Sequence, residues 1–116
     1  MPEFRRIGNE AEDAAANYLL EKGFTIVSRN YKSGASEIDL ICLDGNILVF
    51  VEVRKRRKGS WQSAEESVSP EKQKRLWMTA ENYMAEMREM EGDSRFDVVA
   101  TDGETFRHYE DAFRPA

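Results

Sequence analysis

Cysteine and histidine are almost absent from this chain of 116 residues. Cys42 is its one cysteine and His108 its one histidine. An intrachain disulfide is therefore impossible, and histidine-rich zinc sites or Ser-His-Asp catalysis have almost nothing to draw on. Carboxylates remain as the plausible metal ligands. Because Cys42 lies within the apolar run 38–43, we expect its thiol to be buried and inert.

Long apolar runs are also missing. No stretch reaches the ~18 apolar residues that a membrane span requires, and residues 1–24 carry charges throughout, without the apolar core of a secretory signal. No repeat or interdomain linker divides the chain, and its length is near the commonest size of one domain. We therefore expect a single domain over residues 1–116, in a cytoplasmic protein that has no membrane partner.

The charge is net negative but unevenly placed. A net charge of −5 argues against a protein that coats nucleic acid without specificity. Five consecutive cations nevertheless occupy positions 54–58, and more follow at the next element. Either these cations are a solvated face, or they form a groove for the phosphates of nucleic acid. The groove residues would be Arg56, Arg57, Lys58, Lys72 and Lys74. Trp61, in the polar loop beyond them, either stacks on an unpaired base or packs against the domain.

The periodicity of the apolar residues predicts seven elements. Helical spacing predicts one helix over 10–22 and a second that begins at Ser69-Pro70, where serine caps the helix and proline takes its first position. We expect the apolar stripe of this second helix to be Leu76, Ala80, Tyr83, Met84 and Met87. Strands are predicted over 24–31, 37–43, 47–54, 96–101 and 105–109. The order αβββαββ indicates an α/β sandwich with a mixed sheet, and residues 47–51 are apolar enough to be a strand covered on both faces.

The hairpin between the second and third strands carries the most informative polar residues. Alternation along a strand puts Glu37 and Asp39 on one face, and Glu52 and Arg54 on one face. A two-residue loop of Asp44-Gly45 would place both pairs on the same face, with Glu37 opposite Glu52 and Asp39 diagonal to it. A three-residue loop would place the pairs on opposite faces, because one step of register reverses every side chain.

Carboxylates that converge beside an apolar strand repel one another and are costly to withdraw from water. A hard divalent cation, Mg²⁺ or Mn²⁺, removes both costs, and Mg²⁺ favours one or two carboxylates with water and phosphate completing its shell. Arg54 offers a planar fork that suits phosphate oxygens. This set of residues is suited to phosphodiester hydrolysis. The alternative is a solvated strand end without chemistry.

Residues 36–56, SEIDLICLDGNILVFVEVRKR, resemble the acidic core of the PD-(D/E)XK nuclease superfamily, in which an Asp is followed across a hairpin by Glu-x-Lys. From about Gly8 to Phe113 the chain is similar to the YraN family, small bacterial proteins related to Holliday junction resolvases. The further segments that carry this likeness are Glu12-Asp13-Ala14-Ala15, Tyr18-Leu19, Arg29-Asn30-Tyr31, Ser67-Val68 with Lys72, residues 95–99 and Ala112-Phe113.

The resemblance implies a restriction-endonuclease-like fold in which Asp39 and Glu52 are metal ligands. It also implies that Glu12 approaches the same site, although Glu12 is equally well placed to close a capping box with Asn9. The sequence departs from the family pattern where Arg54 replaces Lys and where Ser36 and Ala11 replace Gly. Arginine stays protonated and demands a fixed geometry. It would slow a reaction in which this residue positions or deprotonates water, but would suffice for stabilising transition-state charge.

Three functions remain open from the sequence. The first is a metal-dependent endonuclease acting on branched or structured DNA, as a homodimer by analogy with junction resolvases. The second is a nucleic-acid-binding module that has lost its chemistry through Arg54. The third is a protein-interaction domain whose carboxylates are surface charge.

Overall fold

The computed structural model describes residues 10–34, 36–59, 68–87 and 92–114. Its elements follow the predicted order αβββαββ. They are α2 (Glu10–Glu21), β1 (Thr25–Ser33), β2 (Ser36–Asp44), β3 (Ile47–Lys55), α4 (Pro70–Met87), β4 (Ser94–Thr101) and β5 (Phe106–Phe113).

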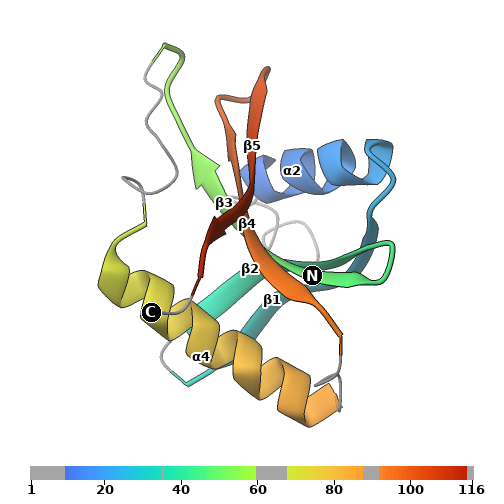
Figure 1. Ribbon diagram of the computed structural model, residues 1–116. Helices are drawn as coiled ribbons and strands as arrows, with labels where there is room; N and C mark the ends of the chain where they lie inside the picture. The colour runs from blue at the N-terminus through green and yellow to red at the C-terminus, as the bar shows by residue number, and fades with distance from the viewer. Residues whose placement is uncertain (1–9, 35, 60–67, 88–91, 115–116) are drawn as a thin grey trace, which may run out of the picture.

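One mixed sheet of five strands forms the middle layer, in the order β1-β2-β3-β4-β5. β3 and β4 run parallel and are joined through α4, whereas the other neighbours are antiparallel. α2 covers one face of the sheet and α4 covers the other (Figure 1). The predicted α/β sandwich with a mixed sheet is therefore confirmed.

The apolar residues of β3 contribute to two cores, one on each face of the sheet. Leu48 and Phe50 pack with α4, while Val49 and Val51 pack with α2. Because a helix covers each face of the sheet, the apolar side chains of β3 are buried on both faces. This confirms the prediction that residues 47–51 form a strand covered on both faces.

Local signals set the ends of the helices. Ser69 Oγ accepts a hydrogen bond from the backbone N–H of Lys72 at 3.2 Å, which caps α4 as predicted. Gly23, at φ +97°, ends α2, which stops at Glu21. The prediction that Met87 belongs to the buried stripe of α4 is wrong, because this residue lies at the last turn, past the core, and is 51% exposed.

No helix within the described ranges has both the length and the apolar character needed to cross a membrane.

Candidate functional site

The β2–β3 hairpin has the even-numbered loop that the site requires, but its register differs from the prediction. Asp44 pairs with Ile47, so the two loop residues are Gly45 and Asn46. The predicted loop of Asp44-Gly45 is therefore wrong by one residue, and the predicted pairing of Glu37 with Glu52 is wrong by two. Asp44 can stay in the ladder because Gly45 takes the positive φ (+61°) of the turn. Even loops keep the same faces together, so the expected sharing of a face is preserved.

Asp39 and Glu52 are the first residues after the two strands separate. The β2–β3 ladder ends at Leu40 paired with Val51, and the next residue on each strand is one of the two carboxylates. Asp39 Oδ2 accepts the backbone N–H of Val53 at 2.8 Å. The Asp39 side chain thus accepts a hydrogen bond from a backbone N–H of β3 that lies beyond the paired part of the two strands. This hydrogen bond holds the carboxylate against β3.

The carboxyl of Asp39 has a strongly perturbed pKa. Burial and the nearby charge of Glu52 raise the pKa from 3.8 to about 8, and the charge of Glu12 adds to the effect. The Val53 N–H and the Lys72 ammonium act in the opposite direction. A carboxyl that burial and like charge both disfavour as an anion is typical of a functional site.

Glu52 is 3% exposed, and two cations that contact one of its carboxylate oxygens compensate its negative charge. Its Oε2 lies 3.2 Å from Arg54 Nη1 and 2.9 Å from Lys72 Nζ. Arg54 comes from the same strand, two residues on, whereas Lys72 comes from the first turn of α4. Sequence reasoning assigned Lys72 only to a phosphate groove. The tertiary structure brings it to the acidic pair.

Glu12 reaches the same region from α2, as the family resemblance implied. Both of its carboxylate oxygens accept from Asn30 Nδ2, at 3.0 and 3.1 Å, and Arg29 Nη2 lies 3.5 Å from Oε1. Asn30 has φ +56°, a conformation that asparagine tolerates better than most residues. Sequence reasoning did not assign a site role to Arg29 or Asn30, because nothing local distinguishes them from other polar strand residues. Asn9, the alternative partner of Glu12, lies outside the described residues.

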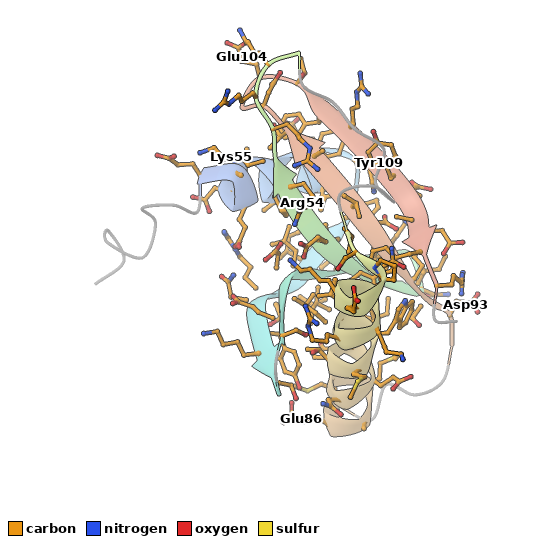
Figure 2. The ribbon with its side chains drawn as sticks, turned by 90° about the vertical axis from the view of Figure 1, so that its left-hand side faces the viewer. Arg54, Lys55, Glu86, Asp93, Glu104 and Tyr109 are labelled. Atoms are coloured by element: carbon orange, nitrogen blue, oxygen red, sulfur yellow. The ribbon has the colours of Figure 1, made fainter. Side chains whose placement is uncertain are left out.

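The cations of the 54–58 run do not all face solvent. Arg56 Nη1 donates to the backbone carbonyl of Lys55 at 3.1 Å, and its own backbone N–H donates to Thr101. Lys58 Nζ lies 2.6 Å from Glu104 Oε1, at the far tip of the β4–β5 turn (Figure 2). Arg57 is exposed. The basic run is thus partly neutralised within the protein.

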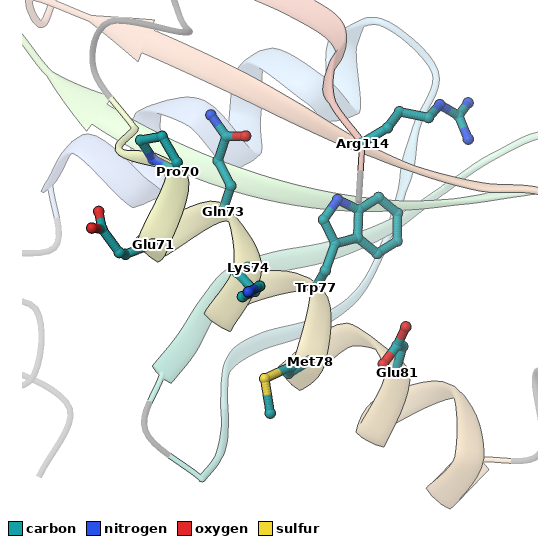
Figure 3. A pocket seen from close by; sticks show the side chains of 8 residues that line it. All are labelled: Pro70, Glu71, Gln73, Lys74, Trp77, Met78, Glu81 and Arg114. Carbon is teal, nitrogen blue, oxygen red and sulfur yellow. The ribbon is translucent and has the colours of Figure 1, made fainter. Parts of the chain in front are cut away.

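Lys74 lies away from the acidic pair. It lines a groove of about 450 Å³ beside α4, together with Trp77 and Met78 of this helix and Arg114, which follows β5 (Figure 3). Lys72 and Lys74, predicted as neighbours in one phosphate groove, therefore contribute to different surfaces. Two residues along a helix correspond to about 200° of rotation, which separates their side chains. Trp61, predicted to stack or to pack, lies outside the described residues.

The donor set suits a cation that takes few protein ligands. Within the described part of the chain, no three His, Cys, Asp or Glu side chains are grouped to hold a metal ion. Asp39 and Glu52 each have one carboxylate oxygen, Oδ1 and Oε1, that is not hydrogen-bonded to another described residue. Two adjacent carboxylates with free oxygens fit Mg²⁺, which commonly takes one or two carboxylates and completes its shell with water and phosphate.

Two further residues, Asp97 and Cys42, lie outside the site. Asp97 is fully buried and binds Arg95 Nε at 2.8 Å and His108 Nε2 at 2.7 Å, so its role is structural. Burial alone would raise the pKa of Asp97, but hydrogen bonds from His108 and Arg95 hold the pKa below its ordinary value. Burial raises the pKa of the Cys42 thiol to about 12, in agreement with an inert cysteine.

Comparison with known proteins gives a consistent family. The model of the uncharacterised protein family UPF0102 matches residues 11–101. A UPF0102 protein of Dechloromonas aromatica is 42% identical over 106 residues, which cover 91% of this chain and 87% of the relative. A UPF0102 protein of Halorhodospira halophila is 43% identical over 110 residues, which cover 95% of this chain and 88% of the relative.

Proposed function

Starting from the fact that this chain belongs to the UPF0102 family, we propose that it is a metal-dependent nucleic-acid-binding protein of nuclease fold that hydrolyses phosphodiesters in branched or structured DNA. One observation carries the proposal. Asp39, which is partly buried, and Glu52, which is buried, follow directly on the end of the β2–β3 ladder, and two cations contact Glu52. The likeness of residues 36–56 to the PD-(D/E)XK core supports the same assignment.

The residues divide into three roles. Asp39 and Glu52 would hold Mg²⁺ or Mn²⁺. When bound, the metal supplies an acidified water and stabilises negative charge on the phosphate. Arg54 keeps its permanent charge beside Glu52, which suits stabilisation of charge on a phosphate rather than proton transfer. Glu12, held by Asn30, adds negative charge to the site and favours occupation by a cation.

Metal binding tests the proposal directly. Calorimetric titration of Mg²⁺ and Mn²⁺ is expected to show binding to the wild-type protein and none to Asp39→Asn. Asp44→Asn is the matched control, because Asp44 lies at the other end of β2 and pairs with Arg95. No binding to the wild-type protein, with or without DNA present, contradicts the proposal.

Cleavage is tested on synthetic four-way junctions beside linear duplexes. Wild-type protein is expected to cleave junctions only with metal, and Asp39→Asn and Glu52→Gln to be inactive while folded. Arg54→Lys restores the residue that the superfamily pattern expects, so we expect it to retain or raise activity. Light scattering of the same samples tests the homodimer that the analogy with junction resolvases implies.

A second candidate is a nucleic-acid-binding module without chemistry, and one contact favours it. Glu52 Oε2 is already engaged by Arg54 and Lys72, so its charge is compensated without a metal. Such a module keeps its DNA affinity in Asp39→Asn and loses affinity when Arg56, Arg57 and Lys58 are replaced together by glutamine. Metal-dependent binding or cleavage that Asp39→Asn abolishes excludes this candidate.

A further inference from the structure

The two cations on Glu52 differ in the element they come from and in their exposure. Arg54 lies on the same strand as Glu52, its side chain is 28% exposed, and its Nε is buried without a hydrogen-bond partner among the described residues. Lys72 reaches Glu52 from α4, and its long, flexible side chain is 37% exposed. Lysine is a compact point charge with rotatable bonds, whereas arginine is a rigid fork. Lys72 is therefore the cation that can leave Glu52 with little rearrangement.

A divalent metal and the Lys72 ammonium compete for the same carboxylate. Nζ of Lys72 lies 2.9 Å from Glu52 Oε2, and its charge also acts on Asp39. A metal ion held between Asp39 and Glu52 would stand close to this ammonium, and like charges at such separations repel. Lys72 must move away for the metal to bind at full strength.

A nucleic-acid phosphate at the N-terminus of α4 would provide an alternative partner for the Lys72 ammonium. Lys72 lies in the first turn of α4, an 18-residue helix whose positive end therefore lies on the same side as the acidic pair. Helix N-termini favour anions such as phosphate. A phosphodiester that approaches the metal from solvent meets Lys72 at the edge of the site.

We infer that Lys72 is an internal counter-cation that occupies Glu52 in the metal-free protein and transfers to a nucleic-acid phosphate when metal binds, so that metal and nucleic acid bind cooperatively. The inference rests on the proposed function, since it assumes metal at Asp39 and Glu52. It assigns to Lys72 a regulatory part in that site, because the residue weakens metal binding until a phosphate is present. Binding energies that depend on each other in this way are reciprocal.

The experiment compares Mg²⁺ affinity in wild type, Lys72→Met, Lys74→Met and Asp39→Asn, by calorimetry at pH 9. At this pH Asp39 is mostly ionised in wild type, since its pKa is about 8. Lys74→Met is the matched control, because it removes the same charge two residues away on the same helix, from the groove beside Trp77 (Figure 3). Each titration is repeated with a phosphorothioate four-way DNA junction, which resists cleavage.

Without DNA, Lys72→Met is expected to bind Mg²⁺ roughly fivefold more tightly than wild type, the scale of a partly exposed ion pair. Lys74→Met is expected to match wild type. The DNA junction is expected to strengthen Mg²⁺ binding more in wild type than in Lys72→Met. Circular dichroism checks that each variant is folded.

Two results contradict the inference and are distinguishable. If Lys72→Met binds Mg²⁺ no more tightly than wild type while Asp39→Asn abolishes binding, the metal site stands and the role of Lys72 is wrong. If wild type binds no Mg²⁺ with or without the DNA junction, the proposed function fails, and this inference fails with it.

Discussion

Replacing Asp39 by asparagine should stabilise the metal-free protein at neutral and alkaline pH. Asparagine has the same shape and keeps an oxygen that can accept the Val53 N–H, now made to Asp39 Oδ2 at 2.8 Å. It removes the charge that burial and Glu52 disfavour. The folded protein therefore loses an unfavourable interaction and keeps its hydrogen bond.

The sign of the pH dependence follows from the raised pKa. In the unfolded chain Asp39 ionises near pH 4, whereas in the folded protein it keeps its proton until about pH 8. Between these values the folded state binds the additional proton, so the stability of the wild type falls as pH rises. Asp39→Asn lacks this loss. The difference between the two proteins should be near zero at pH 4, grow through neutral pH and level off above pH 8.

The magnitude has a ceiling set by the change in pKa. A rise from 3.8 to about 8, at about 1.4 kcal/mol for each tenfold change, corresponds to roughly 6 kcal/mol. The pKa of about 8 already includes the lowering that Lys72 and the Val53 N–H provide. We therefore expect Asp39→Asn to be more stable than wild type by several kcal/mol above pH 8, with about 6 kcal/mol as the upper limit.

Urea unfolding measured by tryptophan fluorescence, from pH 4 to pH 9 in the presence of EDTA, gives this difference. Asp44→Asn is the control, because it removes a carboxylate from the same strand at the ion pair with Arg95 and should not reproduce the pH profile. A stability difference between wild type and Asp39→Asn that is constant over this range, or that favours wild type at pH 8, would refute the reasoning.

Three further predictions concern the surroundings of the site and the core. Glu12→Gln keeps an acceptor for Asn30 but removes a charge that raises the pKa of Asp39, so this pKa should fall in an NMR titration of the carboxyl carbons; an unchanged pKa contradicts the placement of Glu12. Asp97→Asn leaves Arg95 without its buried counter-charge and replaces the carboxylate that is hydrogen-bonded to His108, so it should cost about 3 kcal/mol in urea unfolding; a loss below about 1 kcal/mol contradicts the structural role of Asp97. Cys42, with its buried thiol and a pKa of about 12, should not react with Ellman's reagent at pH 8 until the protein is denatured; rapid reaction of the native protein contradicts its burial.

Local patterns were sufficient for the elements and their order. Each helix and strand carries its own signal, such as the Ser69-Pro70 start of α4 and the apolar run of β3. Local patterns did not fix the register of the β2–β3 hairpin. Asp44, Gly45 and Asn46 are all turn residues, so the sequence allowed more than one two-residue loop, and the positive φ of Gly45 is accommodated in either.

The nearness of Asp39 to Glu52 was accessible from the sequence because both residues lie on one hairpin and an even-numbered loop puts them on one face, although the predicted register placed Asp39 diagonal to Glu52 rather than opposite it. The cations that compensate the charge of Glu52 could not be predicted from the sequence. Lys72 is twenty residues away along the chain, and only the crossover through α4 brings its ammonium to within 2.9 Å of Oε2. Asn30 likewise meets Glu12 only because β1 packs beside α2.

The sequence by itself thus identified the carboxylates that an even-numbered hairpin loop would bring to one face, because alternation along a strand is a local property. The tertiary structure decided which cations face them. It separated Lys72 from Lys74 and paired Lys58 with Glu104. The physical reason is that long basic side chains take their partners from whatever element packs nearby, and that packing depends on contacts between residues far apart in the sequence.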